Sequence, residues 1–545
     1  MPTLEWIGKD KIVSYHQKVP YRFLERKYSF DEGGSKKEDN GSGNMIIRGD
    51  NLEALKSLLP QYTASVKCIY IDPPYNTGNE KWIYNDNVND PRMRKWLGEA
   101  VGKEGEDLSR HDKWLCMMYP RLRLLEKLMA PDGAIFISID NNEKFNLKLI
   151  CDEIFGPSGF VADIAVINNL KGRSDDKYIA TAHESLLIYQ KGSFVTRGVS
   201  LPEEYEKEYK LSDEKGRYRL LGLRKRGSNA REKDRPNLFY PIYYQEASGK
   251  LSLEPADGAV EILPKLSNGE NGTWRWGKST VLERISELEV RLVKKRMEYD
   301  IFQKDYLERE EKRRVKPKSF WSGSEFASET GTLEIKSILG KGQFDTPKPV
   351  GIVEYCLQQA ADKDSIVLDS FAGSGTTAHA VLDMNRKDGG NRKFILVEMM
   401  DYAENVTAER VKRVISGGGK TEGLGGDFSF YEIGEPLFLD GGRLNSQIDE
   451  ERLKEYIWYT EAGGFFEKTR GDENLPFYLG KNKGTAYYLY HTKEQDAVLD
   501  YNFLTNIRER AEHYVIYADR CSLSEAELSE YQITFKKVPR DIKRI

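Results

Sequence analysis

The sequence predicts an α/β fold with a doubly wound, Rossmann-like sheet. Continuous apolar runs, typical of parallel strands buried on both faces, alternate with helical patterns that carry apolar residues on one side. Two of these runs lead into distinctive turns. Residues 66–71 precede Asp72-Pro73-Pro74-Tyr75, and residues 366–368 precede a glycine-rich turn at 371–376. Because open α/β sheets place their chemistry at the carboxyl ends of strands, the two turns mark a candidate site.

Length and composition limit the class of protein. A chain of 545 residues is expected to form two or three domains. Its 83 basic and 87 acidic residues nearly balance, so any nucleic-acid footprint must be local. Five scattered cysteines without C-x-x-C spacing indicate a reducing compartment with no disulfide framework and no zinc site. No apolar run reaches membrane-spanning length and no signal-peptide pattern is present, so we expect a soluble, cytoplasmic protein.

The first 44 residues are aromatic and basic and end in a linker-like stretch, so residues 1–44 are expected to form an N-terminal arm and linker. The folded core is expected to begin with a strand at 45–47. A helix with leucines on one face follows at 51–59, and Asp50 or Asn51 is suited to cap it.

The two prolines after residues 66–71 can continue neither a strand nor a helix, so they hold the chain rigidly at the end of that strand. A long polar loop at 76–110 is expected to be either a functional lid or a surface excursion. An amphipathic helix is predicted at 114–130. Further strands are predicted at 134–139, 160–168 and 183–189.

His183 and Glu184 begin the last of these strands and suggest a metal site. A zinc-binding helix motif needs a second histidine four residues after the first, and none is present. We therefore predict no metal.

The strand–helix alternation is lost between residues 192 and 337. Residues 215–235 are strongly basic, and basic runs interleaved with tyrosine and tryptophan suit a surface that contacts phosphates and stacks on bases. A long charged helix is predicted over 280–311, either as a solvated face or as part of such a surface.

The glycine-rich turn is the second candidate element. Gly373 and Gly375 allow a ligand to lie against bare backbone, and a helix is predicted to open at Thr376. The strand at 393–397 ends at Glu398, and an acid at this place in a doubly wound sheet is suited to bind ribose hydroxyls. Asp369 is expected either to help bind the ligand or to cap the turn.

Residues 417–426 are rich in glycine and are predicted to be a flexible joint. A small C-terminal α/β domain is expected over 427–545. Its predicted strands are 485–490, 513–517 and 532–535.

The D-P-P-Y turn and the F-x-G-x-G-T turn together resemble the amino-group DNA methyltransferases that use S-adenosylmethionine. The D-P-P-Y half precedes the glycine half, which resembles the permuted β group of that family, and within it the modification subunits of type III restriction systems. The resemblance spans about residues 45–415. It implies a catalytic half at 45–191, a target-recognition region at 192–337 and a cofactor-binding half at 338–416.

The resemblance also assigns roles to residues. It implies that the H-E-x-L-x-x-Y segment from His183 lines the target-base pocket and that Lys348-Pro349-Val350 flanks the cofactor. Residues expected to bind S-adenosylmethionine are Asp369, Phe371, Gly373, Gly375, Thr376, Glu398 and, unless it only caps a helix, Asp50.

Methyl transfer to an exocyclic amine has a specific chemical difficulty, because the nitrogen lone pair is delocalised into the base. Two acceptors aimed at the amine hydrogens localise that lone pair and stabilise the developing positive charge. Asp72 can supply a carboxylate oxygen, and Pro73, held by Pro74, a backbone carbonyl. Tyr75 can stack on a flipped base. D-P-P-Y favours adenine N6 over cytosine N4 by family analogy.

The expected partners are double-stranded DNA, a separate restriction subunit with helicase and nuclease activity, and a second copy of the chain. No helicase P-loop pattern occurs in the sequence, so ATP-driven cleavage requires another subunit. The alternatives are a catalytically minor DNA-specificity subunit that recruits a nuclease or helicase, an RNA methyltransferase and a cytosine-N4 methyltransferase.

Overall fold

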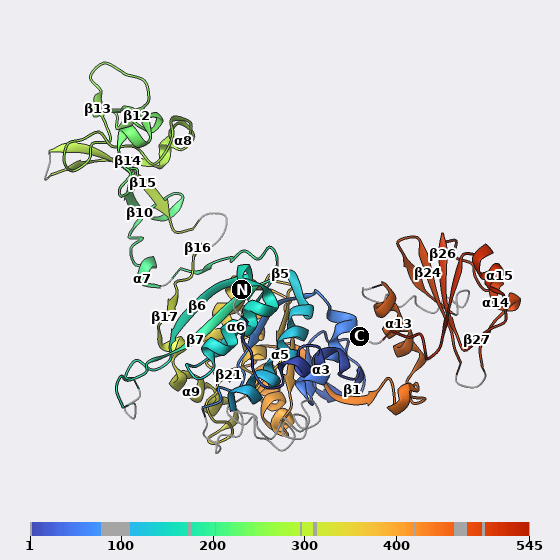
Figure 1. The fold of residues 1–545 in the computed structure, drawn as a ribbon. Coiled ribbons are helices and arrows are strands. Elements are labelled where there is room, and N and C mark those ends of the chain that lie inside the picture. The colour runs from blue at the N-terminus through green and yellow to red at the C-terminus, as the bar shows by residue number, and fades with distance from the viewer. Residues whose placement is uncertain are drawn as a thin grey trace. The chain divides into compact units, whose positions relative to one another are not determined.

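The computed structural model describes residues 3–77, 110–172, 177–201, 203–294, 297–308, 313–418, 421–462, 477–492 and 496–543. It forms two compact units, Gly198–Lys316 and the remainder of the chain. The larger unit is built on a mixed sheet to which eleven of the described strands contribute (Figure 1). In sheet order the strands are β17 (Phe320–Trp321), β6 (Phe160–Ile167), β7 (His183–Gln190), β5 (Met129–Ile139), β4 (Val66–Ile71), β18 (Ile366–Asp369), β19 (Lys393–Glu398), β3 (Met45–Arg48), β22 (Asp427–Pro436), β1 (Arg22–Asp31) and β2 (Gly34–Lys36).

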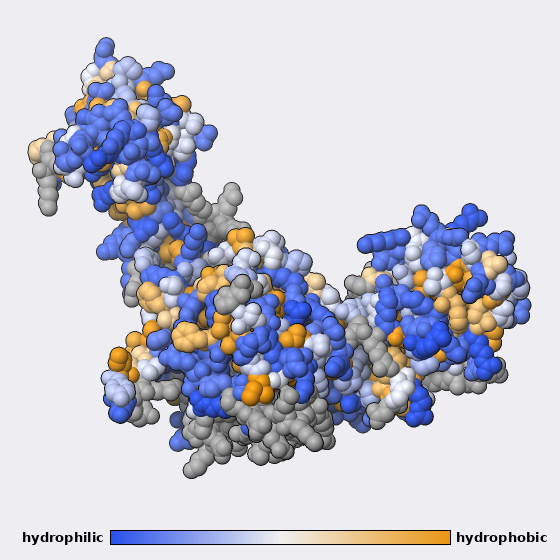
Figure 2. All heavy atoms as spheres, viewed as in Figure 1, coloured by the Kyte–Doolittle hydropathy of each residue, from blue (hydrophilic) through white to orange (hydrophobic). Residues whose placement is uncertain are grey.

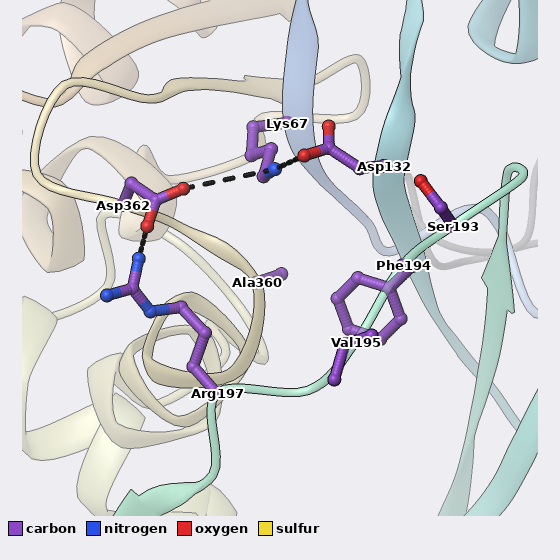
Figure 3. Close-up of a pocket in the computed structure, with 8 residues that line it drawn as sticks. All are labelled: Lys67, Asp132, Ser193, Phe194, Val195, Arg197, Ala360 and Asp362. Atoms are coloured by element: carbon purple, nitrogen blue, oxygen red, sulfur yellow. Dashed lines mark hydrogen bonds and ion pairs between the residues drawn. The ribbon is translucent and has the colours of Figure 1, made fainter.

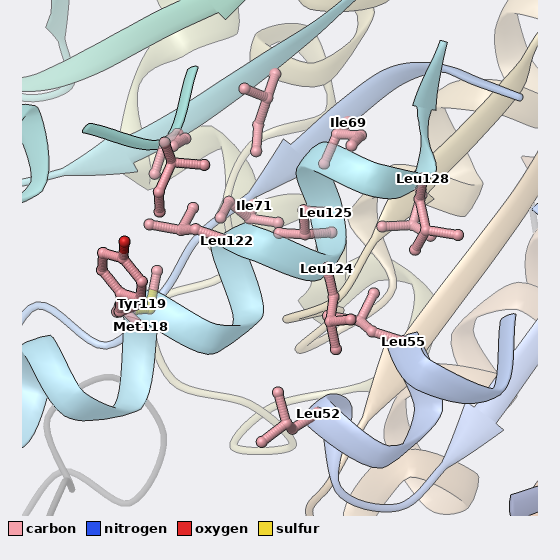
Figure 4. Close-up of a cluster of buried hydrophobic side chains, with 14 of the residues drawn as sticks. Leu52, Leu55, Ile69, Ile71, Met118, Tyr119, Leu122, Leu124, Leu125 and Leu128 are labelled. Atoms are coloured by element: carbon pink, nitrogen blue, oxygen red, sulfur yellow. The ribbon is translucent and has the colours of Figure 1, made fainter. Parts of the chain in front are cut away.

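Helices cover both faces of this sheet, which confirms the predicted doubly wound, Rossmann-like fold. Side chains of β4 alternate between two buried apolar clusters: Ile69 and Ile71 join one, Cys68 and Tyr70 the other. Figure 4 shows the first cluster, where leucines of two helices pack on β4. The helices of the first face are α3 (Asn51–Tyr62), α5 (Arg110–Leu128) and α6 (Lys144–Phe155), and those of the second are α10 (Val350–Ala360), α11 (Thr376–Asp388) and α12 (Glu409–Ser416).

The order of the strands brings the two sequence motifs together. β4 and β18 are parallel neighbours. From β4 the chain crosses to β5 on one side, and from β18 it crosses to β19 on the other. The crossing direction therefore reverses between β4 and β18, and such a switch point is where open α/β sheets bind ligands.

The predicted N-terminal arm is wrong. β1 pairs antiparallel with β22 over eight residue pairs, so the first residues form part of the central sheet. Before it, α1 (Lys9–Ile12) and α2 (Tyr15–Lys18) lie against α5, and Ile12 is fully buried. The error arises because β1 is half-buried and finds its partner some 400 residues later, which no local pattern reveals.

β22 also corrects the expected start of the C-terminal domain, since residues 427–436 belong to the central sheet. The preceding joint, residues 417–426, is tied down by backbone hydrogen bonds from Leu424 and Gly425 to Val414 and Ile415. The remaining C-terminal residues form the predicted small α/β structure, with α13 (Glu450–Ala462), α14 (Tyr501–Leu504) and α15 (Glu525–Glu530). Its strands are β23 (Tyr478–Asn482), β24 (Thr485–Tyr490), β25 (Val498–Leu499), β26 (His513–Ala518), β27 (Arg520–Cys521) and β28 (Ile533–Lys537).

The smaller unit is mostly β-structure around a core that contains Trp274 and Ile301. Figure 2 shows that its visible face is largely hydrophilic. It holds α7 (Glu203–Glu206), α8 (Lys278–Glu283) and the strands β8 (Val199–Ser200), β9 (Leu211–Asp213), β10 (Gly216–Gly222), β11 (Ile242–Gln245), β12 (Lys250–Ser252), β13 (Val260–Ile262), β14 (Leu288–Val293), β15 (Glu298–Tyr306) and β16 (Arg314–Val315).

The long charged helix predicted over 280–311 is wrong, because α8 ends at Glu283, a single 3-10 turn follows at Ile285–Glu287, and β14 and β15 form a hairpin. β15 also pairs with β10, and Ile301 of β15 is completely buried in the apolar core of the unit. Leu282 and Met297, two apolar residues of this segment, are 62% and 73% exposed. Cross-strand packing therefore outweighs helix propensity in this segment.

The lid predicted over 76–110 falls largely on residues 78–109, which lie outside the described residues. No described helix is long and apolar enough to cross a membrane.

Candidate active site

The D-P-P-Y turn lies at the carboxyl end of β4 and is anchored from α5. Asp72 follows the last residue of the strand and is buried. The Pro74 carbonyl accepts a 2.6 Å hydrogen bond from Nε1 of Trp114, whose side chain is fully buried. No hydrogen bond from the described residues reaches the Pro73 carbonyl. The turn is therefore rigid, while the Pro73 carbonyl keeps its acceptor capacity.

Four polar side chains meet beside this turn. Lys348 Nζ donates hydrogen bonds to Tyr75 Oη at 2.6 Å and to Glu184 Oε2 at 2.8 Å. The same nitrogen lies 3.4 Å from Asp72 Oδ1. Tyr75 Oη in turn donates to Glu184 Oε2 at 3.0 Å. Glu184 belongs to β7 and Lys348 to the segment before α10, so distant parts of the sequence build the cluster.

Burial dominates the electrostatics of the cluster. It raises the pKa of Asp72 to about 6, against the opposing effect of the Lys348 ammonium and with a further upward contribution from Glu184. Burial also raises the pKa of Tyr75 well above its usual value. Burial alone lowers the pKa of Lys348, but Asp72 and Glu184 outweigh it, so that pKa is raised and the lysine stays charged.

The glycine-rich turn follows β18 with the left-handed backbone that glycine permits. Gly373 and Gly375 have φ angles of 51° and 80°. A Cβ atom on Gly375 would lie 3.1 Å from the Thr407 carbonyl oxygen, so packing within the protein and the positive φ angle both favour glycine there. The Gly373 amide donates to Glu398 Oε2 at 2.8 Å, and its carbonyl accepts from Thr407 Oγ1 at 2.6 Å.

Asp369 supports the same turn from the end of β18. Its carboxylate accepts a 3.0 Å hydrogen bond from the Phe371 amide and a 2.6 Å bond from Thr377 Oγ1. Burial raises the pKa of Asp369 to about 7, although these hydrogen bonds lower it. The predicted capping role of Asp369 is confirmed, and its ligand-binding role stays a prediction.

A narrow cleft joins the two turns. Of the predicted site residues it contains Asp72, Asp369, Phe371, Gly373 and Thr376. The other residues that line it are Tyr70, Phe344, Thr346, Pro347, Lys348, Ala372 and Ser374. The cleft therefore brings together residues from both halves of the sequence signature.

Two other predicted cofactor ligands already have partners. Asp50 caps α3 by accepting hydrogen bonds from the amides of Leu52 and Glu53, and it also accepts from Arg121 Nη2 at 3.2 Å. Glu398 accepts from the amides of Gly373 and Met400. Capping by Asp50 is confirmed, while contact of Asp50, Glu398 or Gly375 with a cofactor stays a prediction.

The cleft suits a ligand that carries hydrogen-bond donors and a flat ring. Asp72 Oδ1 lies in the cleft, is buried and takes no hydrogen bond within the described chain. Buried polar atoms usually have a partner, so this oxygen is poised for a ligand. The rings of Phe344 and Phe371 line the same cleft and offer apolar contact to an adenine ring. These features fit S-adenosylmethionine and a base amino group.

A wider cavity of about 230 Å³ lies at the opposite, amino edge of the sheet. Figure 3 shows that its charged side chains face one another. Lys67 pairs with Asp132 and Asp362, and Asp362 also pairs with Arg197. Because these charges are satisfied and the cavity is remote from both turns, it is no competing site.

Sequence reasoning noted the segments that contain Glu184 and Lys348 but gave neither residue a role beside Asp72. Two prolines flank Lys348, which is the local signal for a rigidly held side chain. It also missed Arg410, which is fully buried and donates to Ser374 Oγ at 2.8 Å and Thr376 Oγ1 at 2.9 Å. No pattern near Arg410 predicts that contact.

Comparison with known proteins agrees with this geometry. Residues 66–409 match the model of the N6/N4 methyltransferase family, described as DNA methylase. The chain is 36% identical over 420 residues to the type III restriction-modification enzyme EcoPI Mod subunit of Escherichia phage P1, covering 73% of this chain and 63% of that protein. It is 36% identical over 373 residues to the type II methyltransferase M.KpnI of Klebsiella pneumoniae, covering 68% of this chain and 84% of that one.

Among solved structures, the PvuII cytosine-N4-specific DNA methyltransferase aligns with 12% identity and a TM-score of 0.33, over 67% of this chain and 86% of that one. That likeness is too weak to carry an argument. The chain spans less than two thirds of the length of the EcoPI Mod subunit. The family match covers more than half of the chain and both turns of the cleft, so this protein belongs to the N6/N4 DNA methylase family.

Proposed function

We propose that this protein transfers a methyl group from S-adenosylmethionine to the N6 amino group of adenine in duplex DNA. The observation that carries the proposal is the buried Asp72 carboxylate, which has one oxygen without a hydrogen bond and lies in the same cleft as the glycine-rich turn. The enzyme is proposed to act as the modification component of a type III-like restriction-modification system, as the Mod subunits among its relatives are named.

In this mechanism Asp72 Oδ1 and the Pro73 carbonyl accept the two hydrogens of the target amine. Both acceptors are held rigidly, so they favour a pyramidal nitrogen with a localised lone pair. The same oxygens stabilise the positive charge that develops on nitrogen during the transfer. Because the methylated nitrogen is acidic, Asp72 or water can then take one of its protons.

Tyr75 is proposed to stack on the target base, which must leave the duplex to reach the cleft. Its hydroxyl is tied to Glu184 and Lys348, so the ring has a defined orientation. Pro74, held by Trp114, fixes the turn between Asp72 and Tyr75.

S-adenosylmethionine, when bound, supplies an activated methyl group. Asp369, Phe371, Gly373 and Thr376 line the cleft and are proposed to orient it. Glu398, Gly375 and Asp50 shape the surrounding turns, and Glu398 is proposed to reach the ribose.

Recognition of the DNA site is proposed to reside in the smaller unit. Within its basic stretch Arg226, Arg231, Lys233 and Arg235 are exposed, which suits contact with phosphates. Of these, Arg231 also forms a surface ion pair with Glu270. Arg219 and Arg224 are less exposed and pair with Asp305 and Asp300, and Trp274 is a core residue, so these three have structural roles. A restriction subunit and a second copy of the chain are the proposed protein partners.

The test is transfer of labelled methyl from S-adenosylmethionine to genomic DNA that lacks the native modification, followed by digestion to nucleosides. The variants are Asp72→Ala, Asp72→Asn and, as a matched control, Asp163→Asn, which removes a surface ion pair with Lys144. We expect label in N6-methyladenine for the native protein and the control, and a loss of at least about 100-fold in both Asp72 variants.

The other possible outcomes of this experiment identify the alternative functions. Label in N4-methylcytosine keeps the mechanism and refutes the adenine assignment. Label on RNA alone indicates an RNA methyltransferase. Site-specific DNA binding without any methyl transfer indicates a specificity subunit that recruits a nuclease or helicase.

A further inference from the structure

Lys348 lies between two buried carboxylates of the candidate active site. Its ammonium is 2.8 Å from Glu184 Oε2 and 3.4 Å from Asp72 Oδ1. It hydrogen-bonds to Glu184 and Tyr75, whereas Asp72 Oδ1 takes no hydrogen bond within the described chain. The lysine therefore places a positive charge beside Asp72 while leaving that oxygen open.

The backbone of Lys348 is held from several sides. Pro347 and Pro349 flank it, and its carbonyl accepts a 3.1 Å hydrogen bond from Thr376 Oγ1 of the glycine-rich turn. Gly331 of α9 (Ser328–Leu339) packs directly on this segment, where an added Cβ would lie 2.4 Å from the Pro347 carbonyl oxygen. This support fixes the ammonium relative to both turns.

Apart from a hydrogen bond from Tyr75, the other surroundings of Asp72 oppose its negative charge. Burial opposes ionisation, and among the described residues the other titratable groups that face it are acids. These acids are Glu184, Tyr70, Tyr75 and Asp369. Within the described part of the chain, Lys348 is the cation that acts on Asp72.

We infer, on the basis of the methyl transfer proposed above, that Lys348 is a positioning residue that keeps Asp72 ionised, and that Glu184 holds the lysine away from Asp72 Oδ1. The acceptor role of Asp72 requires an ionised carboxylate. A protonated carboxyl group carries an O–H donor and has less capacity to accept a hydrogen bond from the amine. A lysine bound tightly to Asp72 would compete with the amine for the same oxygen. A lysine that binds Glu184 and lies beside Asp72 keeps Asp72 ionised and also leaves Asp72 Oδ1 open to the amine.

The first measurement is the pH dependence of the single-turnover rate of methyl transfer. The native profile is expected to rise with pH through an acid limb near pH 6, as Asp72 ionises. Lys348→Met removes the favourable charge, so the limb should move upward by about 1–3 pH units. Lys348→Arg keeps the charge and should leave the limb near its native position.

Glu184→Gln makes the opposite prediction. It removes a negative neighbour and frees Lys348 to pair with Asp72, so the limb should move to lower pH while the plateau rate falls. The matched control is Lys536→Met, which breaks a 2.8 Å pair with Glu461 in the C-terminal structure and should leave the profile unchanged.

A second measurement does not depend on activity. Carbon-13 NMR of protein labelled at the aspartate carboxyl carbon gives the Asp72 titration directly, with Asp72→Asn identifying the resonance. The titration should shift upward in Lys348→Met and downward in Glu184→Gln. If Lys348→Met does not fold, the direction of the shift in the Asp72 titration of Glu184→Gln tests the inference.

Unchanged titration of Asp72 in the folded variants, together with a lower rate, would overturn the inference and leave Lys348 a merely structural role. An upward shift in Glu184→Gln would also overturn it. Absence of methyl transfer by the native protein refutes the proposed function alone, because the carbon titration still measures the effect of Lys348 on Asp72.

Discussion

Replacing Gly331 with alanine is expected to destabilise the protein, although alanine is normally the better residue inside a helix. The substitution favours a helix by about 1 kcal/mol. At this position, however, the new Cβ would lie 2.4 Å from the Pro347 oxygen, 2.8 Å from the Pro349 nitrogen and 3.0 Å from the Lys348 carbonyl carbon. All three are backbone atoms and cannot rotate away.

Overpacking of this kind costs about 1–3 kcal/mol, so the net loss of unfolding free energy should be about 1 kcal/mol. Relief of the clash must move α9 or the segment that carries Lys348. Methyl transfer should therefore fall more than the small loss of stability explains. Urea denaturation gives the free energy of unfolding, and single-turnover kinetics gives the transfer rate.

The matched control is Thr332→Ala, an exposed position on the same helix, which should change the free energy of unfolding by less than about 0.5 kcal/mol. The reasoning is refuted if Gly331→Ala is about 1 kcal/mol more stable than the native protein and transfers methyl at the native rate. That result would mean that helix propensity alone governs the position.

Three further predictions concern other parts of the fold. Trp114→Phe leaves the Pro74 carbonyl without its donor and should cost about 1–3 kcal/mol in urea denaturation, with a clear fall in transfer rate; native rates would contradict the anchoring role. Burial raises the pKa of Asp369 to about 7 in the folded protein, above its usual 3.8, so the folded state binds this proton more tightly. Native stability should therefore fall by about 3 kcal/mol as pH rises from 4 to 7. Asp369→Asn should reduce this pH dependence of stability, measured by urea denaturation at several pH values. An unchanged slope would show that Asp369 does not cause the dependence. Ser524→Ala breaks a capping box with Glu527 and should cost about 1 kcal/mol by hydrogen exchange of the C-terminal strands, whereas Ser522→Ala should cost less.

The sequence alone was enough to predict the doubly wound sheet and the two turns of the candidate site. The strands that carry them are buried on both faces and so contain continuous apolar runs that no other element explains as well. The prolines after Ile71 and the glycines after Asp369 mark the ends of β4 and β18. These signals are local, because they follow from burial and backbone geometry within a few residues.

Local patterns failed where a segment is only half-buried. β1 and β22 lie toward one edge of the sheet and contain both apolar and polar residues. Their pairing depends on residues that are far apart in the sequence. The hairpin of β14 and β15 has apolar residues at spacings compatible with a helix, and contact with β10 decides its structure.

Only the tertiary structure decided the charge state of the candidate site. Asp72, Glu184 and Lys348 lie in three distant segments, and no local pattern predicts that the three side chains meet. Their strand order and the support of Lys348 by α9 bring them within hydrogen-bonding distance in a buried setting. Because the pKa of a carboxyl group depends on burial and on charges a few ångströms away, the sequence could identify Asp72 but could not predict its ionisation.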